Sequence, residues 1–340
     1  DAGEEAGLNG LVGGLDAIII NTEPDHQQSA VQEFLDTTGY RVADAFENGA
    51  FRLCVLKAEG SADILVQSRK GPSPFEPVSD YPKARHLPST RLETYLFRTP
   101  DLERYVSIQR DRGVNFMTDD MIESDACRFI QTVPSTYTGF SLGFIEWKQD
   151  DHDYRTAGSE PLDWHFEKPA WPHLRNIGLL DHTATRLEAR DRDPAIIEFM
   201  NLTNYNFDFS VYVRRFNSIT NVARLSEKDF AMVFTSGVRP YVSDEESGPT
   251  EKFVRNYGKR VHHMAFHTEE IQDTFRALKD HGMEFLVELV GNEQEGLRQT
   301  FSEASPHTLL VNEYIYRYGD FDGFFTMSNV TKLTEATDKQ

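Results

Sequence analysis

An internal repeat constrains the fold of this chain more than any other feature of the sequence. Three segments of the first half recur in the same order in the second half, at a spacing of roughly 165 to 170 positions. The matched pairs are residues 14–17 with 179–182, Arg91 with Arg260, and Phe144 with Tyr314. The shared order and nearly constant spacing indicate a duplication, so the two halves are expected to share one fold.

Each half is predicted to hold two βαβββ modules, because runs rich in β-branched and aromatic residues flank helix-like stretches. In the second half, the first module is expected to have a strand at 180–187, a helix at 194–203, and strands at 207–214, 219–225 and 230–235. The second is expected to have a strand at 260–266, a helix at 269–281, and strands at 284–287, 297–302 and 309–316. We therefore expect an α+β fold in which duplicated βαβββ modules form two half-open barrels with helices outside. A last helix near 329–337 is expected to close over a barrel mouth.

The repeat also suggests the domain boundaries. Residues 1–150 are expected to form an N-terminal domain and residues 176–340 a C-terminal domain. The segment 151–175 between them is rich in charged residues and contains Trp164 and Trp171. We interpret it as a linker.

Composition limits the partners and the compartment. The 340-residue chain has a formal net charge of -20, so its surface repels nucleic acid and anionic membranes. No apolar run approaches the ~20 residues of a membrane span, and the sequence begins without the basic and apolar regions of an export signal. The two cysteines, Cys54 and Cys127, form no disulfide framework. We expect a cytoplasmic protein with no nucleic-acid or membrane partner.

The repeat provides an internal control for three residues that are suited to bind a metal. His182, His263 and Glu313 lie on three predicted strands of the second half, whereas the aligned residues of the first half are not metal ligands. Two imidazoles and one carboxylate on one face form a ligand set that leaves open coordination positions; it suits Fe(II) best and would accept Mn, Co or Zn. The sequence therefore predicts a metal site in the second half alone. The aligned residues are Ala17, Thr94 and Gly143.

Two neighbours of the predicted ligands receive other assignments. His262 precedes His263, and the alternation of side chains along a strand places its imidazole on the opposite face. Asp181 precedes His182 and aligns with Asp16 of the first half. Because both halves carry this aspartate, it is interpreted as serving the fold rather than the metal.

The motifs around the three predicted ligands resemble a known family. Residues 180–182 (Leu-Asp-His), 261–265 (Val-His-His-Met-Ala) and 312–317 (Asn-Glu-Tyr-Ile-Tyr-Arg) are similar to motifs of 4-hydroxyphenylpyruvate dioxygenase and hydroxymandelate synthase, members of the vicinal-oxygen-chelate superfamily. The resemblance implies the vicinal-oxygen-chelate, or glyoxalase-like, fold. It also implies that His182, His263 and Glu313 hold a catalytic Fe(II), with O2 as cosubstrate.

The resemblance also suggests substrate-binding residues. Gln299 and Phe301 resemble a Gln-x-Phe strand in which Gln lies beside the substrate and Phe stacks on its ring. Asn329 matches an Asn that begins the lid helix, Asn221 stands where the family has a serine that orients substrate, and Ser236 lies in a strand that departs from the family's Pro-x-Asn-Glu-Pro pattern. The metal ligands are thus kept, and the substrate-binding residues are altered.

We therefore expect a non-haem Fe(II) dioxygenase that couples oxidative decarboxylation of a 2-oxo acid, similar to 4-hydroxyphenylpyruvate, to hydroxylation. Two alternatives remain open from the sequence. One is a metal-dependent lyase resembling 3-dehydroshikimate dehydratases, in which the metal acts as a Lewis acid without oxygen chemistry. The other is a member of the superfamily that binds a ligand without catalysis. The resemblance further implies a homodimer or homotetramer.

Overall fold

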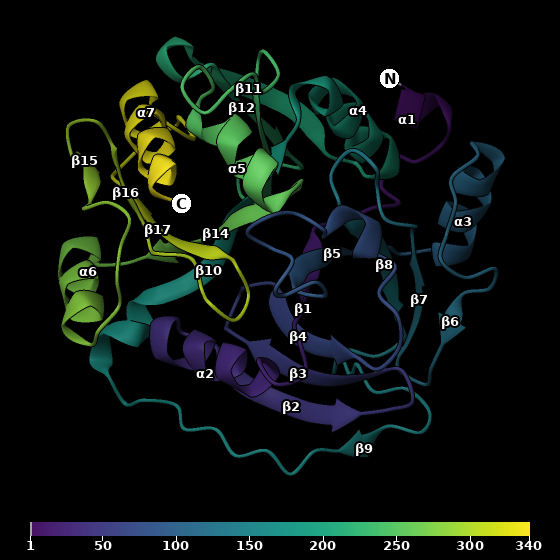
Figure 1. Cartoon of the computed structure of the whole chain (residues 1–340). Helices are drawn as coiled ribbons and strands as arrows, with labels where there is room; N and C mark the ends of the chain where they lie inside the picture. The colour runs from purple at the N-terminus through teal and green to yellow at the C-terminus, as the bar shows by residue number, and fades with distance from the viewer. Residues whose placement is uncertain (1) are drawn as a thin grey trace.

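The computed structural model describes residues 2–340 and contains two large mixed sheets with helices around them (Figure 1). The first sheet has the strand order β6-β7-β8-β5-β1-β4-β3-β2-β9. Its strands are β1 (Leu15–Asn21), β2 (Arg41–Glu47), β3 (Phe51–Lys57), β4 (Asp63–Arg69), β5 (Arg91–Arg98), β6 (Ile122–Glu123), β7 (Cys127–Gln131), β8 (Ser141–Trp147) and β9 (Glu160–Pro161). The helices of this half are α1 (Ala2–Glu5), α2 (Gln27–Thr37) and α3 (Leu102–Asp111).

The second sheet has the order β11-β12-β13-β10-β14-β17-β16-β15. Its strands are β10 (Ile177–Leu187), β11 (Asn206–Val213), β12 (Ser218–Arg224), β13 (Ala231–Gly237), β14 (Arg260–Thr268), β15 (Val290–Asn292), β16 (Leu297–Phe301) and β17 (Val311–Arg317). Its helices are α4 (Arg192–Leu202), α5 (Pro249–Tyr257), α6 (Ile271–Asp280) and α7 (Met327–Ala336). The strand predicted at 284–287 is wrong: Phe285 makes only an isolated bridge to Ser302, and the strand in this region is β15.

The two sheets share one topology, which confirms the duplicated α+β fold. Apart from the added β9, each strand of the first sheet has a counterpart in the same place in the second. The register agrees as well: Leu96 lies opposite Gly143 in one half, and Ala265 lies opposite Glu313 in the other. The repeat read from the sequence is therefore a repeat in three dimensions.

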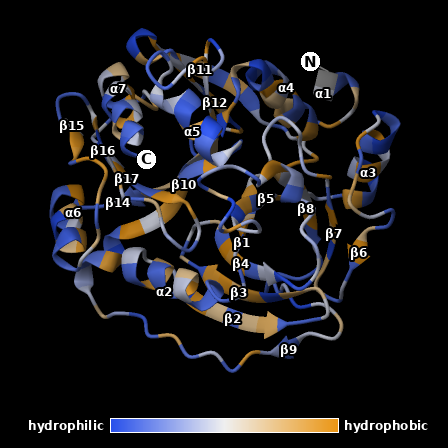
Figure 2. Ribbon diagram, viewed as in Figure 1, coloured by the Kyte–Doolittle hydropathy of each residue, from blue (hydrophilic) through white to orange (hydrophobic). Residues whose placement is uncertain are grey.

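One apolar core joins the halves. A single buried cluster includes Ile18 and Phe97 from one face of the first sheet and Phe234 and Phe266 from one face of the second. Figure 2 shows the same arrangement, with apolar colour concentrated on the strands and polar colour on exposed helix surfaces and loops. The opposite faces of the sheets form separate, smaller clusters inside each half-barrel.

Different segments fill the open sides of the two half-barrels. In the first half, residues from the segment predicted as a linker take part: Tyr154 packs on the inner cluster and donates a 2.7 Å hydrogen bond to Asp63, and β9 adds to β2. In the second half, α7 packs against the edge strands β11 and β15 and against β16. The last helix therefore covers the mouth of the second half-barrel (Figure 1).

Among the described residues, no helix combines the length and the apolar character needed to cross a bilayer.

Candidate metal centre

Three adjacent strands bring the predicted metal ligands together. His182 on β10 and Glu313 on β17 both lie opposite Ala265 of β14, and His263 lies two residues before Ala265 on that central strand. All four side chains therefore point to one face of the sheet. One ligand atom from each of His182, His263 and Glu313 lies within 4.8 Å of the other two, and all three residues are buried.

The spacing of these atoms fits a metal ion. Oε2 of Glu313 lies 3.1 Å from Nε2 of His182 and 3.1 Å from Nε2 of His263. Adjacent ligands of an octahedral ion with bonds of about 2.1 Å are separated by roughly 3 Å, so the two imidazoles and the carboxylate can share one ion. The donor set and its geometry thus fit a divalent metal with open coordination positions.

The imidazole of His182 is held in the orientation that metal binding requires. Its Nδ1 lies 2.7 Å from Oδ2 of Asp181, which also receives hydrogen bonds from Arg317 at 2.6 and 3.1 Å. Donation from Nδ1–H to Asp181 leaves the Nε2 lone pair free for a metal. Asp181 therefore orients the candidate ligand His182, so the prediction that it only stabilises the fold was incomplete. Its counterpart Asp16 accepts instead from Nε1 of Trp147 at 2.8 Å.

His263 is oriented by His262, which the sequence placed on the wrong face. The pairing of β10 with β14 shifts register between Ala184 and Thr185, and such an irregularity interrupts the alternation of side chains. As a result, Nδ1 of His262 lies 2.8 Å from Nδ1 of His263, and its ring also packs on Phe301.

The tautomers of this histidine pair follow from its environment. Burial and the nearby positive charge of Arg186 hold the pKa of His262 well below its usual range, so this ring is neutral. It accepts the Nδ1–H of His263 and donates its own Nε2–H to Oε1 of Gln340, 2.6 Å away. The Nε2 lone pair of His263 is thereby left for a metal.

The charges of the metal-free site are strongly coupled. Burial disfavours the charged form of His182, but the Glu313 carboxylate and the hydrogen bond to Asp181 outweigh it and raise the pKa of His182 to about 9. Burial lowers the pKa of His263 to about 4, with partial compensation from Glu313. Burial alone would raise the pKa of Glu313, yet His182 and His263 lower it to about 2. Without a metal, the site therefore holds one imidazolium, one neutral imidazole and one carboxylate.

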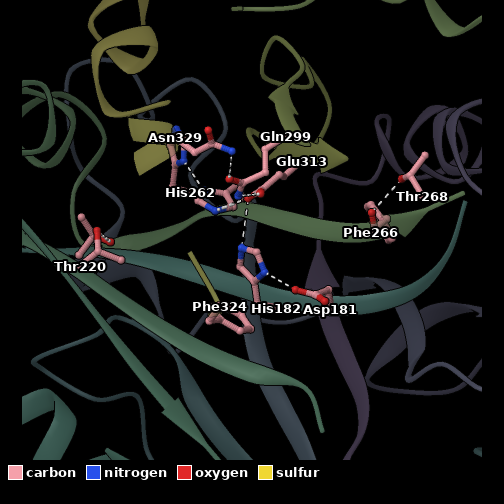
Figure 3. Close-up of polar contacts among 12 residues, drawn as sticks. Asp181, His182, Thr220, His262, Phe266, Thr268, Gln299, Glu313, Phe324 and Asn329 are labelled. Carbon is pink, nitrogen blue, oxygen red and sulfur yellow. Dashed lines mark hydrogen bonds and ion pairs between the residues drawn. The ribbon is translucent and has the colours of Figure 1, made fainter. Parts of the chain in front are cut away.

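A chain of amides connects Glu313 to the covering helix (Figure 3). Gln299 on β16 donates a 2.5 Å hydrogen bond to Oε1 of Glu313, and Asn329 on α7 donates a 3.1 Å bond to Oε1 of Gln299. Phe301 stands two residues along β16 from Gln299, with its ring 4.6 Å from that of His263. The structure thus brings Gln299, Phe301 and Asn329 to the metal site; their roles toward substrate stay predictions.

The space above the ligands is small. A cavity of about 40 Å³ is bounded by ligands His263 and Glu313, by Phe325, and by Val330 and Leu333 of α7. Pockets for small molecules usually measure roughly 300–1,000 Å³. The walls on this side come from α7 and the loop before it, so this cover limits the space beside the candidate ligands.

Two predicted substrate residues do not reach this cavity. Asn221 donates to the carbonyl of Phe234, and Ser236 donates to the carbonyl of Gly237, so both are occupied by backbone partners. The alternating neighbours Thr220 and Thr235 line the cavity instead. A displacement of one residue along a strand moves a side chain to the opposite face. Asn221 and Ser236 therefore face away from this cavity, and a role for them toward substrate stays a prediction.

The first half shows why only one barrel carries ligands. Its counterpart of Glu313 is Gly143, where a Cβ atom would lie 2.7 Å from Cε2 of Phe129 and would also collide with Leu96. Ala17 and Leu96 belong to an apolar cluster that fills this half-barrel. The structure therefore leaves no room for a carboxylate there, in agreement with the comparison of the two halves by sequence.

A search of solved structures establishes the fold. A triple mutant of 4-hydroxymandelate synthase from Streptomyces coelicolor aligns with a TM-score of 0.69 and 16% identity over 97% of this chain and 99% of the other. The chain shares the fold of 4-hydroxymandelate synthase. The expected vicinal-oxygen-chelate architecture is thereby confirmed.

A second structure agrees with this result. A fusion protein of a xylose isomerase-like TIM barrel and 4-hydroxyphenylpyruvate dioxygenase aligns with a TM-score of 0.67 and 13% identity, over 97% of this chain. The chain spans 53% of the length of that fusion protein. No protein-family model matches the sequence, and no curated protein matches it in sequence. At these identities the likeness establishes the fold alone.

Proposed function

We propose that this protein is a non-haem Fe(II) dioxygenase acting on a 2-oxo acid. The observation that carries the proposal is the convergence of His182, His263 and Glu313 in a buried, covered half-barrel of a duplicated fold. Two imidazoles and one carboxylate with open positions are typical of non-haem Fe(II) oxygenases. When bound, Fe(II) would supply the activation of O2 and the oxidation of the substrate, and this chain would supply geometry and exclusion of water.

The residues have separate tasks in this proposal. The three ligands hold the ion on one side and leave positions for a chelating 2-oxo acid and for O2. Asp181 and His262 fix the ligand tautomers through the 2.7 and 2.8 Å contacts described above. Phe301 offers a flat apolar surface beside the site, and α7 closes over the substrate to keep water out.

O2 consumption tests the proposal. Protein reconstituted with Fe(II) under ascorbate is given a panel of aryl and alkyl 2-oxo acids, and O2, CO2 and product mass are recorded. We expect uptake of O2 matched by release of CO2 and a hydroxylated acid as product. His263→Ala should abolish both, whereas Thr94→Ala, at the aligned position of the first half, should not.

The alternatives give different outcomes in the same experiment. Anaerobic loss of water from 3-dehydroshikimate, with no O2 uptake for any 2-oxo acid, would replace the dioxygenase with a lyase. Stoichiometric binding without turnover of any compound would indicate a binding protein. An active, metal-replete His263→Ala enzyme would refute the assignment of the ligands.

We also propose that the chain assembles into a homodimer or homotetramer, as the family resemblance implies. Sedimentation equilibrium measures this directly, and a monomer at micromolar concentration would refute it.

A further inference from the structure

The cavity beside the metal ligands contains a buried cation with no anionic partner. Arg186, near the end of β10, lines the cavity and is only 3% exposed. Its Nη1 donates a 2.9 Å hydrogen bond to Oγ1 of Thr250, and its Nε has no partner. No carboxylate of the described residues lies within 4.0 Å of its nitrogens. A buried charge normally requires an ionic or hydrogen-bonding partner, because removal from water is costly.

The remaining neighbours do not neutralise this charge. Glu251 exerts an attraction on Arg186 but lies beyond ion-pair distance, and its Oε2 accepts from the backbone N–H of Gly248 at 2.8 Å. Phe253 places its ring 5.9 Å from Cζ of Arg186, which is a weak contact for a charge. Burial lowers the pKa of Arg186 only to about 10, so the guanidinium keeps its proton at neutral pH.

The first half again serves as a control. The residue aligned with Arg186 is Asn21, whose amide reaches the carbonyl of Ser89 at 2.7 Å and whose oxygen accepts from the backbone of Arg69. A buried charge also occurs there, on Glu93, but Arg69 pairs with it at 2.7 Å. Buried Arg91 of the first half also lacks an ion pair among the described residues, but its guanidinium donates to the carbonyls of Gly139 and Val78 and does not line the cavity beside the candidate ligands. The first half thus places an amide with backbone partners where the second half places the guanidinium of Arg186 beside the candidate ligands.

The position of Arg186 defines where an anion would sit. Arg186 pairs with Thr235, and Thr235 pairs with Thr220, so these three side chains form one row across the sheet. His263 lies opposite Ala184, two residues earlier on β10. At about 3.3 Å per residue, the row of Arg186 lies roughly 7 Å along the strand from His263. Apolar side chains, including Val233 and Phe301, line the same cavity.

We propose that Arg186 determines specificity by binding a second carboxylate of the substrate, distal to its 2-oxo acid group. The substrate class is then a 2-oxo acid with an apolar body and a terminal carboxylate. Its 2-oxo acid end chelates the metal, and its far end forms an ion pair with the unpaired side of the guanidinium, beside the hydroxyls of Thr220 and Thr235. This inference rests on the proposed function for the 2-oxo acid end and adds the second charge.

Matched ligand pairs test the inference by binding, separately from turnover. Co(II)-loaded protein is titrated without O2, and visible absorption of the cobalt reports chelation. One pair is 2-oxopimelate and its analogue with a distal carboxamide; the other is 4-carboxyphenylpyruvate and 4-carbamoylphenylpyruvate. Because a hydrogen-bonded charge contributes about 10- to 100-fold in affinity, the diacid of at least one pair should bind that much more tightly. Arg186→Gln should remove this preference, and Arg186→Lys should keep part of it.

Arg260 provides the matched control. It is also 3% exposed and lies opposite Arg186 in the register, but its guanidinium donates to the carbonyl of Thr90, outside the cavity. Arg260→Gln should keep the diacid preference. In urea unfolding of metal-free protein, Arg186→Met should leave the midpoint unchanged or raise it, whereas Arg260→Met should lower it. Equal loss of stability in both would assign Arg186 a structural role.

The outcomes separate this inference from the proposed function. A diacid preference that depends on Arg186, without O2 uptake by the Fe(II) protein, would support the inference and remove the dioxygenase. O2 uptake with equal affinity for diacids and carboxamides, or a preference that survives in Arg186→Gln, would overturn the inference and keep the dioxygenase.

Discussion

Metal binding should release one proton near neutral pH, and that proton should come from His182. In the metal-free protein the pKa of His182 is raised to about 9, so its imidazole is protonated at pH 7. A metal needs the neutral ring with a free Nε2 lone pair. His263, with its pKa lowered to about 4, is already neutral and releases none. Glu313, with its pKa lowered to about 2, is already a carboxylate.

The expected magnitude follows from this single proton. Between pH 7 and 9 the metal affinity should rise about tenfold per pH unit, or about 1.4 kcal/mol per unit. The rise should end near pH 9, where His182 in the metal-free protein loses its proton. Toward the pKa of His263 near 4, a second proton competes and the dependence should steepen.

Isothermal titration calorimetry with Mn(II) or Co(II) at pH 7, in buffers of different ionisation enthalpy, counts the proton directly. Asp181→Asn removes a carboxylate that favours the imidazolium, so fewer protons should be released. Asp16→Asn, the aligned change in the first half, should leave the count at one. Release of no proton by the wild type, or an affinity independent of pH between 7 and 9, would refute the reasoning.

Three further outcomes are expected. The raised pKa of His182 means that its protonation stabilises the folded metal-free protein. This contribution is complete below the unfolded pKa of about 6.5 and is lost as pH rises through about 9. The free energy of unfolding in urea should therefore be higher at pH 7 than at pH 10, by up to about 3 kcal/mol. Gly143→Ala should destabilise the protein by about 1–3 kcal/mol through the clash with Phe129, measured in urea, and should leave metal affinity unchanged because it alters the other half. Asn329→Ala should weaken Co(II) binding about tenfold by releasing Gln299, whereas Thr331→Ala, at a half-buried position of α7 whose hydroxyl donates to the carbonyl of Met327, should have no effect in the same titration.

Comparison of the two halves of the sequence predicted the fold and the group of candidate metal ligands. The fold follows from the repeat, because each strand of one sheet has its counterpart in the other. The contrast of His182, His263 and Glu313 with three aligned residues that cannot bind metal predicted the group that the structure brings within 4.8 Å. Here duplication gives information that composition alone does not contain.

The sequence was misleading where a shift of one residue decides which face of the sheet a side chain occupies. His262 was assigned to the wrong face because the irregular pairing near Ala184 is not visible as a pattern in the sequence. Asn221 and Ser236 were selected by resemblance, although Val222 and Val233, which belong to the inner cluster, mark the alternate positions as the inward ones. That alternation was present in the sequence and would have pointed to Thr220 and Thr235.

Arg186 could not have been assigned by pattern, because a single Arg in a strand is commonly an exposed or paired residue. Its significance depends on its surroundings in the folded chain, where Glu251 attracts the guanidinium from beyond ion-pair distance and no carboxylate of the described residues lies within 4.0 Å. The two half-barrels therefore differ in what they enclose. The first is filled by apolar side chains such as Leu65 and Leu96, and the second encloses the candidate metal ligands and the unpaired Arg186, which under our proposals bind a metal and a distal carboxylate. A fold with one core through both halves can tolerate this, because the stability of the first half supports the second.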